Sequence, residues 1–243
     1  MSAQALQTVL QTIENAARRA GRPTPRLLAV SKRQPATAIA DLAAHWHALP
    51  PGMTALAGEQ APAFGENYVQ EAKAKQAGLS DLRLEWHLIG HLQSNKAADA
   101  ASIFDWVQTV DRPALVEALA RHRAADRPPL DVLVQVNIDD ETSKHGCRPD
   151  AVDALATAIA AQSNLSLRGL MAIPAPHPDL EQRRTAFRRT RALFDALQRQ
   201  HPQVDTLSMG MSEDFAIAIE EGSTMVRLGT ALFGQRPPRG HDA

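Results

Sequence analysis

A lysine stands where a buried strand is expected to end. The stretch LLAVSKRQP, residues 27–35, passes from four apolar residues directly into Ser31, Lys32 and Arg33. A lysine at the mouth of a buried strand is uncommon unless the site needs an amine or a cation. A desolvated lysine whose pKa falls below the usual value of about 10.4 can attack a carbonyl carbon, because only the neutral amine is nucleophilic. Lys32 is therefore the first candidate for chemistry.

Two glycine-rich turns near the other end of the chain, SMGMS and RLGTALFG, predict an anion site. Glycine lets a backbone approach a ligand closely, and Ser208 and Thr230 add hydroxyl donors. The amides of Gly229 and Thr230, which open a short last helix, would point at an anion. Glu213 and Asp214 would repel a phosphate at the start of the preceding helix. We therefore expect the anion on the Ser208 turn and the Gly229–Thr230 amides.

A lysine and a phosphate-binding rim in one site suggest a phosphorylated aldehyde held as a Schiff base. The plain alternatives are a solvated Lys32 at a strand end, ordinary turn glycines, and an Arg227 that simply pairs with a carboxylate. A further reading is a phosphosugar barrel in which Lys32 never bonds to a cofactor.

Eight short apolar runs predict the strands that position these residues: 27–30, 63–66, 85–90, 104–110, 131–138, 167–173, 206–210 and 225–229. Their apolar residues are consecutive, which is typical of strands buried on both faces of a parallel sheet. Strand–helix alternation repeated eight times predicts an α/β fold, a single (β/α)8 TIM barrel with an additional N-terminal helix at 2–20. A doubly wound open sheet is the main alternative, since periodicity does not show closure.

Helix signals lie between the strands. Asp111 is expected to cap a helix in 111–124. The apolar stripe of 186–198 and the segment from Ser212 to Gly222 predict two more helices. In a parallel barrel the active groups gather at the carboxyl ends of the strands, which would bring Lys32 and both glycine-rich turns to one rim.

The bulk properties narrow the class of protein. The 243 residues carry 26 basic and 27 acidic side chains, so charge gives no argument for nucleic acid or a membrane as the partner. The single cysteine, Cys147, cannot form an internal disulfide. The N-terminus lacks the apolar core of a signal peptide, and no run of about 18 apolar residues exists. We expect one domain, 1–243, in a soluble cytoplasmic protein.

The remaining motifs give weaker signals for function. His87 and His91 have the i, i+4 spacing of a metal site but span a strand end and a turn, so no metal is expected. The arginines of 183–199 are interpreted as a solvated helix face rather than a nucleic-acid surface. Lys144, in ETSKHG, ends the fifth strand at the same rim. It is either part of a surface loop or a secondary contact to the ligand.

The motifs LLAVSK, FGENYVQEA, EWHLIGHLQSNK, LVQVNI and LSMGMSEDFAIAIEEGSTMVRLGTALFG resemble the pyridoxal phosphate homeostasis protein family, which is related to the N-terminal barrel of alanine racemase. The resemblance covers almost the whole chain. It implies a non-catalytic protein that binds pyridoxal 5′-phosphate (PLP) as a lysine aldimine and buffers or delivers it, with apo-enzymes as possible recipients.

The same resemblance implies the site residues. Lys32 would carry the cofactor, and Ser208, Gly229 and Thr230 would bind its phosphate. Arg227 would face the pyridine nitrogen. A guanidinium does not give up its proton, so this nitrogen would stay unprotonated and the ring would be a weaker electron sink. Asn67 and His87 would line the side of the ring.

Two departures qualify the resemblance. The 45–62 segment looks longer than is usual in the family, and we expect it to lie outside the pocket. The racemase's C-terminal β domain, with its second catalytic base, is not expected, so a monomer is the default. The alternative function is a one-base amino-acid racemase, in which Lys32, His87 or Tyr68 would have to move the α-proton.

Overall fold

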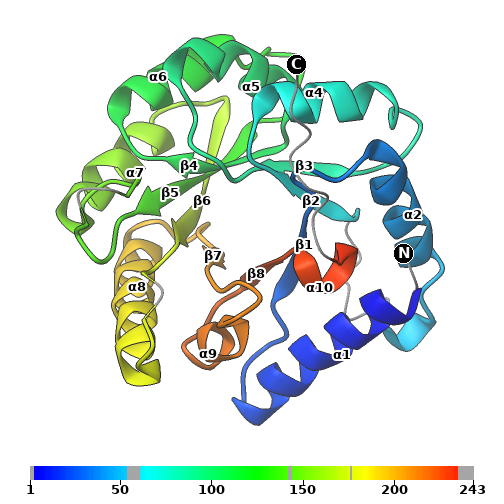
Figure 1. The fold of residues 1–243 in the computed structure, drawn as a ribbon. Helices are drawn as coiled ribbons and strands as arrows, with labels where there is room; N and C mark the ends of the chain where they lie inside the picture. The colour runs from blue at the N-terminus through cyan, green and yellow to red at the C-terminus, as the bar shows by residue number, and fades with distance from the viewer. Residues whose placement is uncertain (1–2, 54–60, 142–143, 176, 235–243) are drawn as a thin grey trace, which may run out of the picture.

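The computed structural model describes residues 3–53, 61–141, 144–175 and 177–234. Its strands form one closed parallel barrel in chain order (Figure 1). The strands are β1 Arg26–Val30, β2 Ala63–Glu66, β3 Glu85–Leu88, β4 Trp106–Val110, β5 Leu130–Val136, β6 Leu165–Ala172, β7 Thr206–Ser208 and β8 Met225–Leu228. Each predicted run overlaps one of them, and the pairing of β1 with β8 closes the sheet. The barrel is confirmed and the open sheet is excluded.

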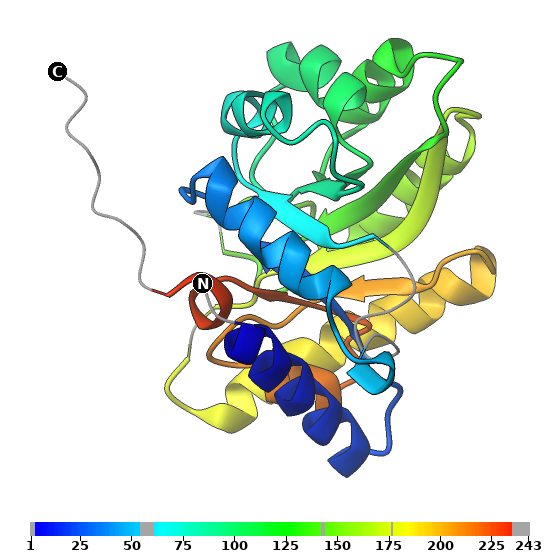
Figure 2. The same cartoon turned by 90° about the vertical axis from the view of Figure 1, so that its right-hand side faces the viewer.

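The helices surround the barrel, most of them between successive strands, whereas the first precedes β1 and the last follows β8 (Figure 1). They are α1 Ala3–Arg19, α2 Ala36–His47, α4 Val69–Ala77, α5 Ala97–Ile103, α6 Pro113–His122, α7 Val152–Ala160, α8 Leu180–Gln200, α9 Phe215–Glu220 and α10 Thr230–Phe233, with short 3-10 turns at Ser94–Lys96 and Pro149–Ala151. The N-terminal helix is confirmed: α1 packs against α2, α9 and α10 (Figure 2). None of the helices in the described ranges combines the length and apolarity that a membrane crossing requires.

Two helix starts differ from the prediction. Arg112, not Asp111, is the N-cap of α6, and Asp111 pairs with the Arg112 guanidinium at 2.6 Å instead of capping. The helix expected from Ser212 begins at Phe215, because the Asp214 carboxylate accepts the Met211 amide at 2.7 Å and holds a turn there. Both differences arise from side-chain partners that periodicity does not show.

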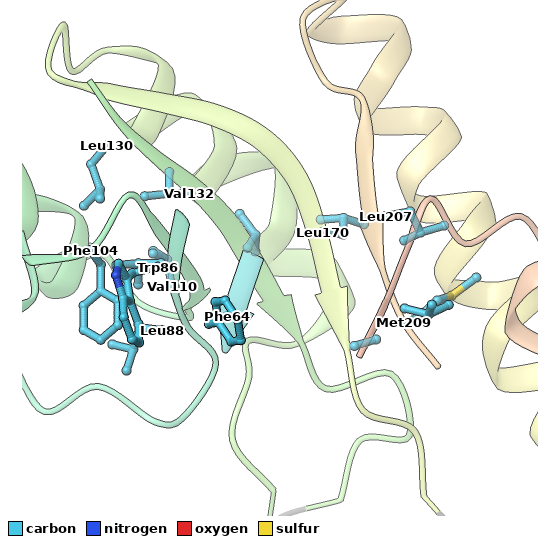
Figure 3. Packing of buried hydrophobic residues seen from close by; sticks show 14 of the residues in the cluster. Phe64, Trp86, Leu88, Phe104, Val110, Leu130, Val132, Leu170, Leu207 and Met209 are labelled. Atoms are coloured by element: carbon cyan, nitrogen blue, oxygen red, sulfur yellow. The ribbon is translucent and has the colours of Figure 1, made fainter. Parts of the chain in front are cut away.

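Successive side chains of a strand point to opposite faces, and both faces of this sheet are buried. Leu27 and Ala29 belong to the large apolar layer between sheet and helices, whereas Leu28 belongs to a separate small cluster with Ala63 and Met225. Figure 3 shows part of the large layer, where Phe64 and Trp86 lie among other buried apolar side chains. The barrel interior is thus a second, smaller core, and it also holds polar residues.

Gly169 in β6 gives a test of the barrel's packing. Its φ is +147°, and a Cβ there would lie 1.9 Å from the Thr206 carbonyl oxygen on β7. Gly169→Ala is expected to lower the free energy of unfolding by about 3 kcal/mol, from overpacking and backbone strain. Urea denaturation measures it. Gly78→Ala is the control, because its nearest atom is 3.8 Å away, and should stay within about 0.5 kcal/mol of wild type. Equal losses would contradict this account.

Candidate cofactor site

A cavity of about 390 Å³ opens at the carboxyl ends of the barrel strands. Its lining comes mainly from the ends of, or the segments just after, seven strands: Val30 and Lys32 (β1), Asn67 (β2), Ile89 (β3), Lys144 (β5), Ile173 and Pro174 (β6), Met211, Ser212, Glu213 and Asp214 (β7), and Arg227, Gly229 and Thr230 (β8). Arg183, on α8, completes the lining among the described residues. Ligand sites of parallel barrels lie at this end, and the volume is in the range that holds a small organic ligand.

The cavity brings together most of the predicted site residues. Five of the seven line it: Lys32, Asn67, Arg227, Gly229 and Thr230. Ser208 and His87 are not part of the lining, and both side chains are completely buried. They lie beneath the cavity, in the barrel interior.

Arg227 is held rigidly on β8. One terminal nitrogen, Nη1, donates to the carbonyl oxygen and the hydroxyl of Ser208, both at 2.8 Å, and Nη2 donates to the Ala172 carbonyl at 2.9 Å. Burial lowers the pKa of Arg227 to about 10, while the charge of Asp214 opposes this shift. The guanidinium therefore remains a cation at neutral pH, with its direction set by fixed acceptors.

The end of β8 has the features of an anion site. Gly229 is the N-cap of α10, and the first amides of a helix have no acceptor within it. A Cβ on Gly229 would lie 3.0 Å from the Val30 carbonyl oxygen, so the glycine lets β8 and β1 stay close at this rim. The Thr230 hydroxyl adds a further donor.

A buried ionic cluster fixes the backbone on both sides of Lys32. The ammonium of Lys75, on α4, uses its three protons on the Ser31 carbonyl at 2.8 Å and on the carboxylates of Glu66 and Glu71, both at 2.7 Å. Glu71 also accepts the amide of Arg33 at 2.5 Å. Residues 31 and 33 are thus tied to the same ammonium, directly or through Glu71.

Glu66 completes this cluster. Its carboxylate accepts the Ser31 hydroxyl at 2.6 Å, and its side chain is fully buried. Burial raises the pKa of Glu66, and the hydrogen bonds from Lys75 and Ser31 act in the opposite direction. The sequence carried one weak signal for this cluster, the i, i+4 spacing of Glu71 and Lys75. Its attachment to Ser31 could not be read from spacing.

Lys144 lies on the cavity wall, far from β1 in the sequence. Its ammonium is 3.5 Å from Glu141 and 3.7 Å from Asp139, and it makes no hydrogen bond within the described residues. Arg183 also lines the cavity, and the sequence gave no reason to single it out from the other arginines of α8. These two cations were not assigned a firm role from the sequence.

The remaining motifs lie away from the cavity lining. His91 stacks on His145, with ring centroids 3.8 Å apart, whereas His87 bonds to Glu85 and Gln108, so the two predicted i, i+4 rings have separate partners. Cys147 is buried, and burial raises the pKa of its thiol to about 12. Residues 54–60 of the long 45–62 segment lie outside the described residues, and the rest of that segment does not line the cavity.

Comparisons of the sequence and of the fold with known proteins agree on the family to which this chain belongs. The model of the alanine racemase N-terminal domain matches residues 4–237. A pyridoxal phosphate homeostasis protein of Pseudomonas aeruginosa is 47% identical over 236 residues, which cover 96% of this chain and 95% of the relative. The chain belongs to the pyridoxal phosphate homeostasis protein family.

Two solved structures with similar folds differ in sequence identity and in how much of their length this chain matches. PipY of Synechococcus elongatus, a structure with PLP bound, has a TM-score of 0.78 at 36% identity, covering 96% of this chain and 99% of that one. An alanine racemase of Clostridium difficile has a TM-score of 0.65 at 15% identity, and the match spans 94% of this chain but 57% of the racemase. The racemase therefore shares the barrel fold.

The Lys75 cluster makes a stability prediction. Lys75→Met leaves the buried Glu66 and its neighbour Glu71 without their cation, so the free energy of unfolding should fall by about 3–5 kcal/mol in urea denaturation. Lys73→Met is the matched control on the same helix, since Lys73 and Asp99 form an exposed pair 2.9 Å apart. Its loss should be below about 1 kcal/mol. Similar losses for the two variants would show that the cluster is not structural.

Proposed function

We propose that this protein binds pyridoxal 5′-phosphate covalently through Lys32 and acts as a carrier in the homeostasis of that cofactor. The observation that carries the proposal is one cavity that contains Lys32, Arg227 and the Gly229–Thr230 turn together. A family named for this cofactor, and a solved relative with PLP bound, support it.

The side chains of the cavity fit an anionic aldehyde. Four basic and two acidic side chains line it: Lys32, Lys144, Arg183, Arg227, Glu213 and Asp214. This excess of positive charge suits a phosphate ester, and the amides at the start of α10 add directed donors. The cavity also contains the amine of Lys32, just after the end of β1, with which an aldehyde can condense.

Each residue has a distinct role in this proposal. The neutral amine of Lys32 condenses with the aldehyde and releases one water, and hydrolysis reverses the bond. Gly229 and Thr230 hold the phosphate, Arg227 donates toward the ring nitrogen, and Asn67 lines the ring. When bound, the cofactor supplies an electron-withdrawing ring, and a guanidinium at its nitrogen weakens that property.

The surroundings favour a carrier over the racemase alternative. A one-base racemase needs a residue that takes and returns the α-proton, and three were considered. His87 is completely buried and occupied by Glu85 and Gln108. Tyr68 is 66% exposed and does not line the cavity. Lys32 remains of the three, so no second base is available among them and two-base racemisation is not favoured.

The proposal also covers the domain organisation, the location, the oligomeric state and the partners of the protein. We propose that residues 1–243 act as one domain, that the protein is a cytoplasmic monomer, and that apo-enzymes are the recipients of the cofactor. Size-exclusion chromatography with light scattering tests the monomer. Transfer to an apo-enzyme, followed by the recovery of that enzyme's activity, tests delivery.

Lys32→Ala tests the covalent site. The wild-type protein incubated with PLP should gain visible absorbance, and borohydride reduction followed by peptide mapping should find the adduct on the peptide that contains Lys32. Lys32→Ala should lose both signals, because the proposal assigns the condensing amine to Lys32 and not to Lys144, the other lysine of the cavity lining. Lys73→Ala, at an exposed position, is the control and should behave as wild type. A reduced adduct on another lysine, or a wild type that stays colourless, would overturn the proposal.

Lys144→Ala tests the secondary contact. Removing this cation from the cavity wall should weaken PLP binding about fivefold, equivalent to about 1 kcal/mol, with the adduct still on Lys32. Equilibrium titration and the rate of cofactor release measure the effect. Unchanged affinity and release would mean that Lys144 belongs to the loop alone.

A further inference from the structure

A chain of polar side chains runs through the barrel interior from the cavity to the opposite end. It begins at Arg227, which donates to the Ser208 hydroxyl at 2.8 Å. That hydroxyl donates to the Oε1 atom of Gln108, on β4, at 2.7 Å. Ser208 and Gln108 are both completely buried. The cavity-lining guanidinium is therefore connected to a residue that does not touch the cavity.

The chain continues toward the amino ends of the strands. The Nε2 atom of Gln108 lies 2.9 Å from Nδ1 of His87, and Nε2 of His87 lies 2.5 Å from the Glu85 carboxylate. The same carboxylate oxygen accepts Arg26 at 2.7 Å. Arg26 and Glu85 are the first residues of β1 and β3, at the end of the barrel opposite the cavity.

Glu85, at the amino end of β3, determines which atoms of the chain donate hydrogen bonds and which accept them. Burial would raise the pKa of Glu85, but the hydrogen bond from His87 and the charge and hydrogen bond of Arg26 lower it below its usual value. Glu85 is therefore ionised and only accepts. Burial lowers the pKa of His87, so its ring is neutral and carries its proton on Nε2, facing Glu85. Its Nδ1 must then accept.

This tautomer fixes the side-chain amide of Gln108. The NH₂ group has to face Nδ1 of His87, and it also lies 3.2 Å from the Met225 sulfur, which can only accept. The carbonyl oxygen of Gln108 then faces Ser208 and accepts a hydrogen bond from the Ser208 hydroxyl. A lone pair of the Ser208 oxygen is left for Arg227, so each donor in the chain finds one acceptor.

We infer that Gln108 is a positioning residue for Arg227, which it orients through the Ser208 hydroxyl with the neutral His87 as its anchor. The inference rests on the proposed function, in which Arg227 faces the ring nitrogen of PLP. It gives His87 and Ser208 a role beneath the cavity, in place of direct contact with the cofactor. A guanidinium that loses the fixed Ser208 hydroxyl keeps two carbonyl acceptors but is aligned less exactly with the ring, and small misplacements in a binding site are costly.

Gln108→Met tests the inference, because it keeps the length of the side chain and removes both polar atoms. In the full-length protein loaded with PLP, the variant should release the cofactor about tenfold faster than wild type and show a shifted visible absorbance maximum. Gln198→Met is the matched control: its amide donates to the Val204 carbonyl at 2.8 Å, away from the cavity. The control should match wild type in both measurements.

Two further variants separate positioning from folding. Burial favours the protonated carboxyl in Gln108→Glu, which still accepts from the Ser208 hydroxyl and can donate to Nδ1 of His87, so its release rate should return to within about twofold of wild type. Ser208→Ala should speed release about tenfold, and the Ser208→Ala, Gln108→Met double variant should be no faster than either single variant, since both break one chain. Thermal melting reports any loss of fold separately.

The outcomes are distinct. A wild-type adduct on Lys32 with Gln108→Met indistinguishable from wild type in release and spectrum overturns the inference and leaves the proposed function standing. Additive effects of Ser208→Ala and Gln108→Met, or a Gln108→Glu variant as fast as Gln108→Met, also overturn it. A wild type that forms no adduct on Lys32 overturns both.

Discussion

The pairing of β1 with β8 is the constraint on which the site depends. It closes the sheet and aligns Leu28 with Arg227 and Ala29 with Leu228. The residues that follow these two strands, Lys32 on one side and Gly229–Thr230 on the other, therefore line one cavity although they are far apart in the sequence. An open sheet with the same strands would leave them at opposite edges.

Two unlike polar networks support the two basic residues of that rim. Lys32 stands between backbone groups held by an ionic cluster centred on Lys75, whereas Arg227 is held by carbonyls and by a neutral hydroxyl. A buried cluster in which one ammonium makes three hydrogen bonds resists deformation, and a directional chain leaves the guanidinium charged. The amine can thus change its bonding while its backbone stays in place.

The sequence was enough to predict the strands and the cavity at the carboxyl end of the barrel. It did not predict the chain of buried polar residues beneath that cavity. Consecutive apolar runs marked all eight strands, and glycines with lysine marked the cavity, because these signals are local. Gln108 looked like any residue of a strand, and its importance follows from which side chains the barrel brings beside it. His87 and Ser208 were linked to the cofactor by resemblance, and closure of the barrel buries them below it. Asp111 and Ser212 were misjudged as helix starts for the same reason, since their neighbours decided the outcome.

Gly229 shows how closely folding and ligand binding can be joined. Its missing side chain allows β8 to lie against the Val30 carbonyl, and it is the N-cap of α10 and part of the cavity lining. A mutational survey would therefore mark position 229 as intolerant without revealing which requirement was violated. Thr230, to which the proposed function assigns a hydroxyl contact with the ligand, is the position at which selection for that ligand would be visible.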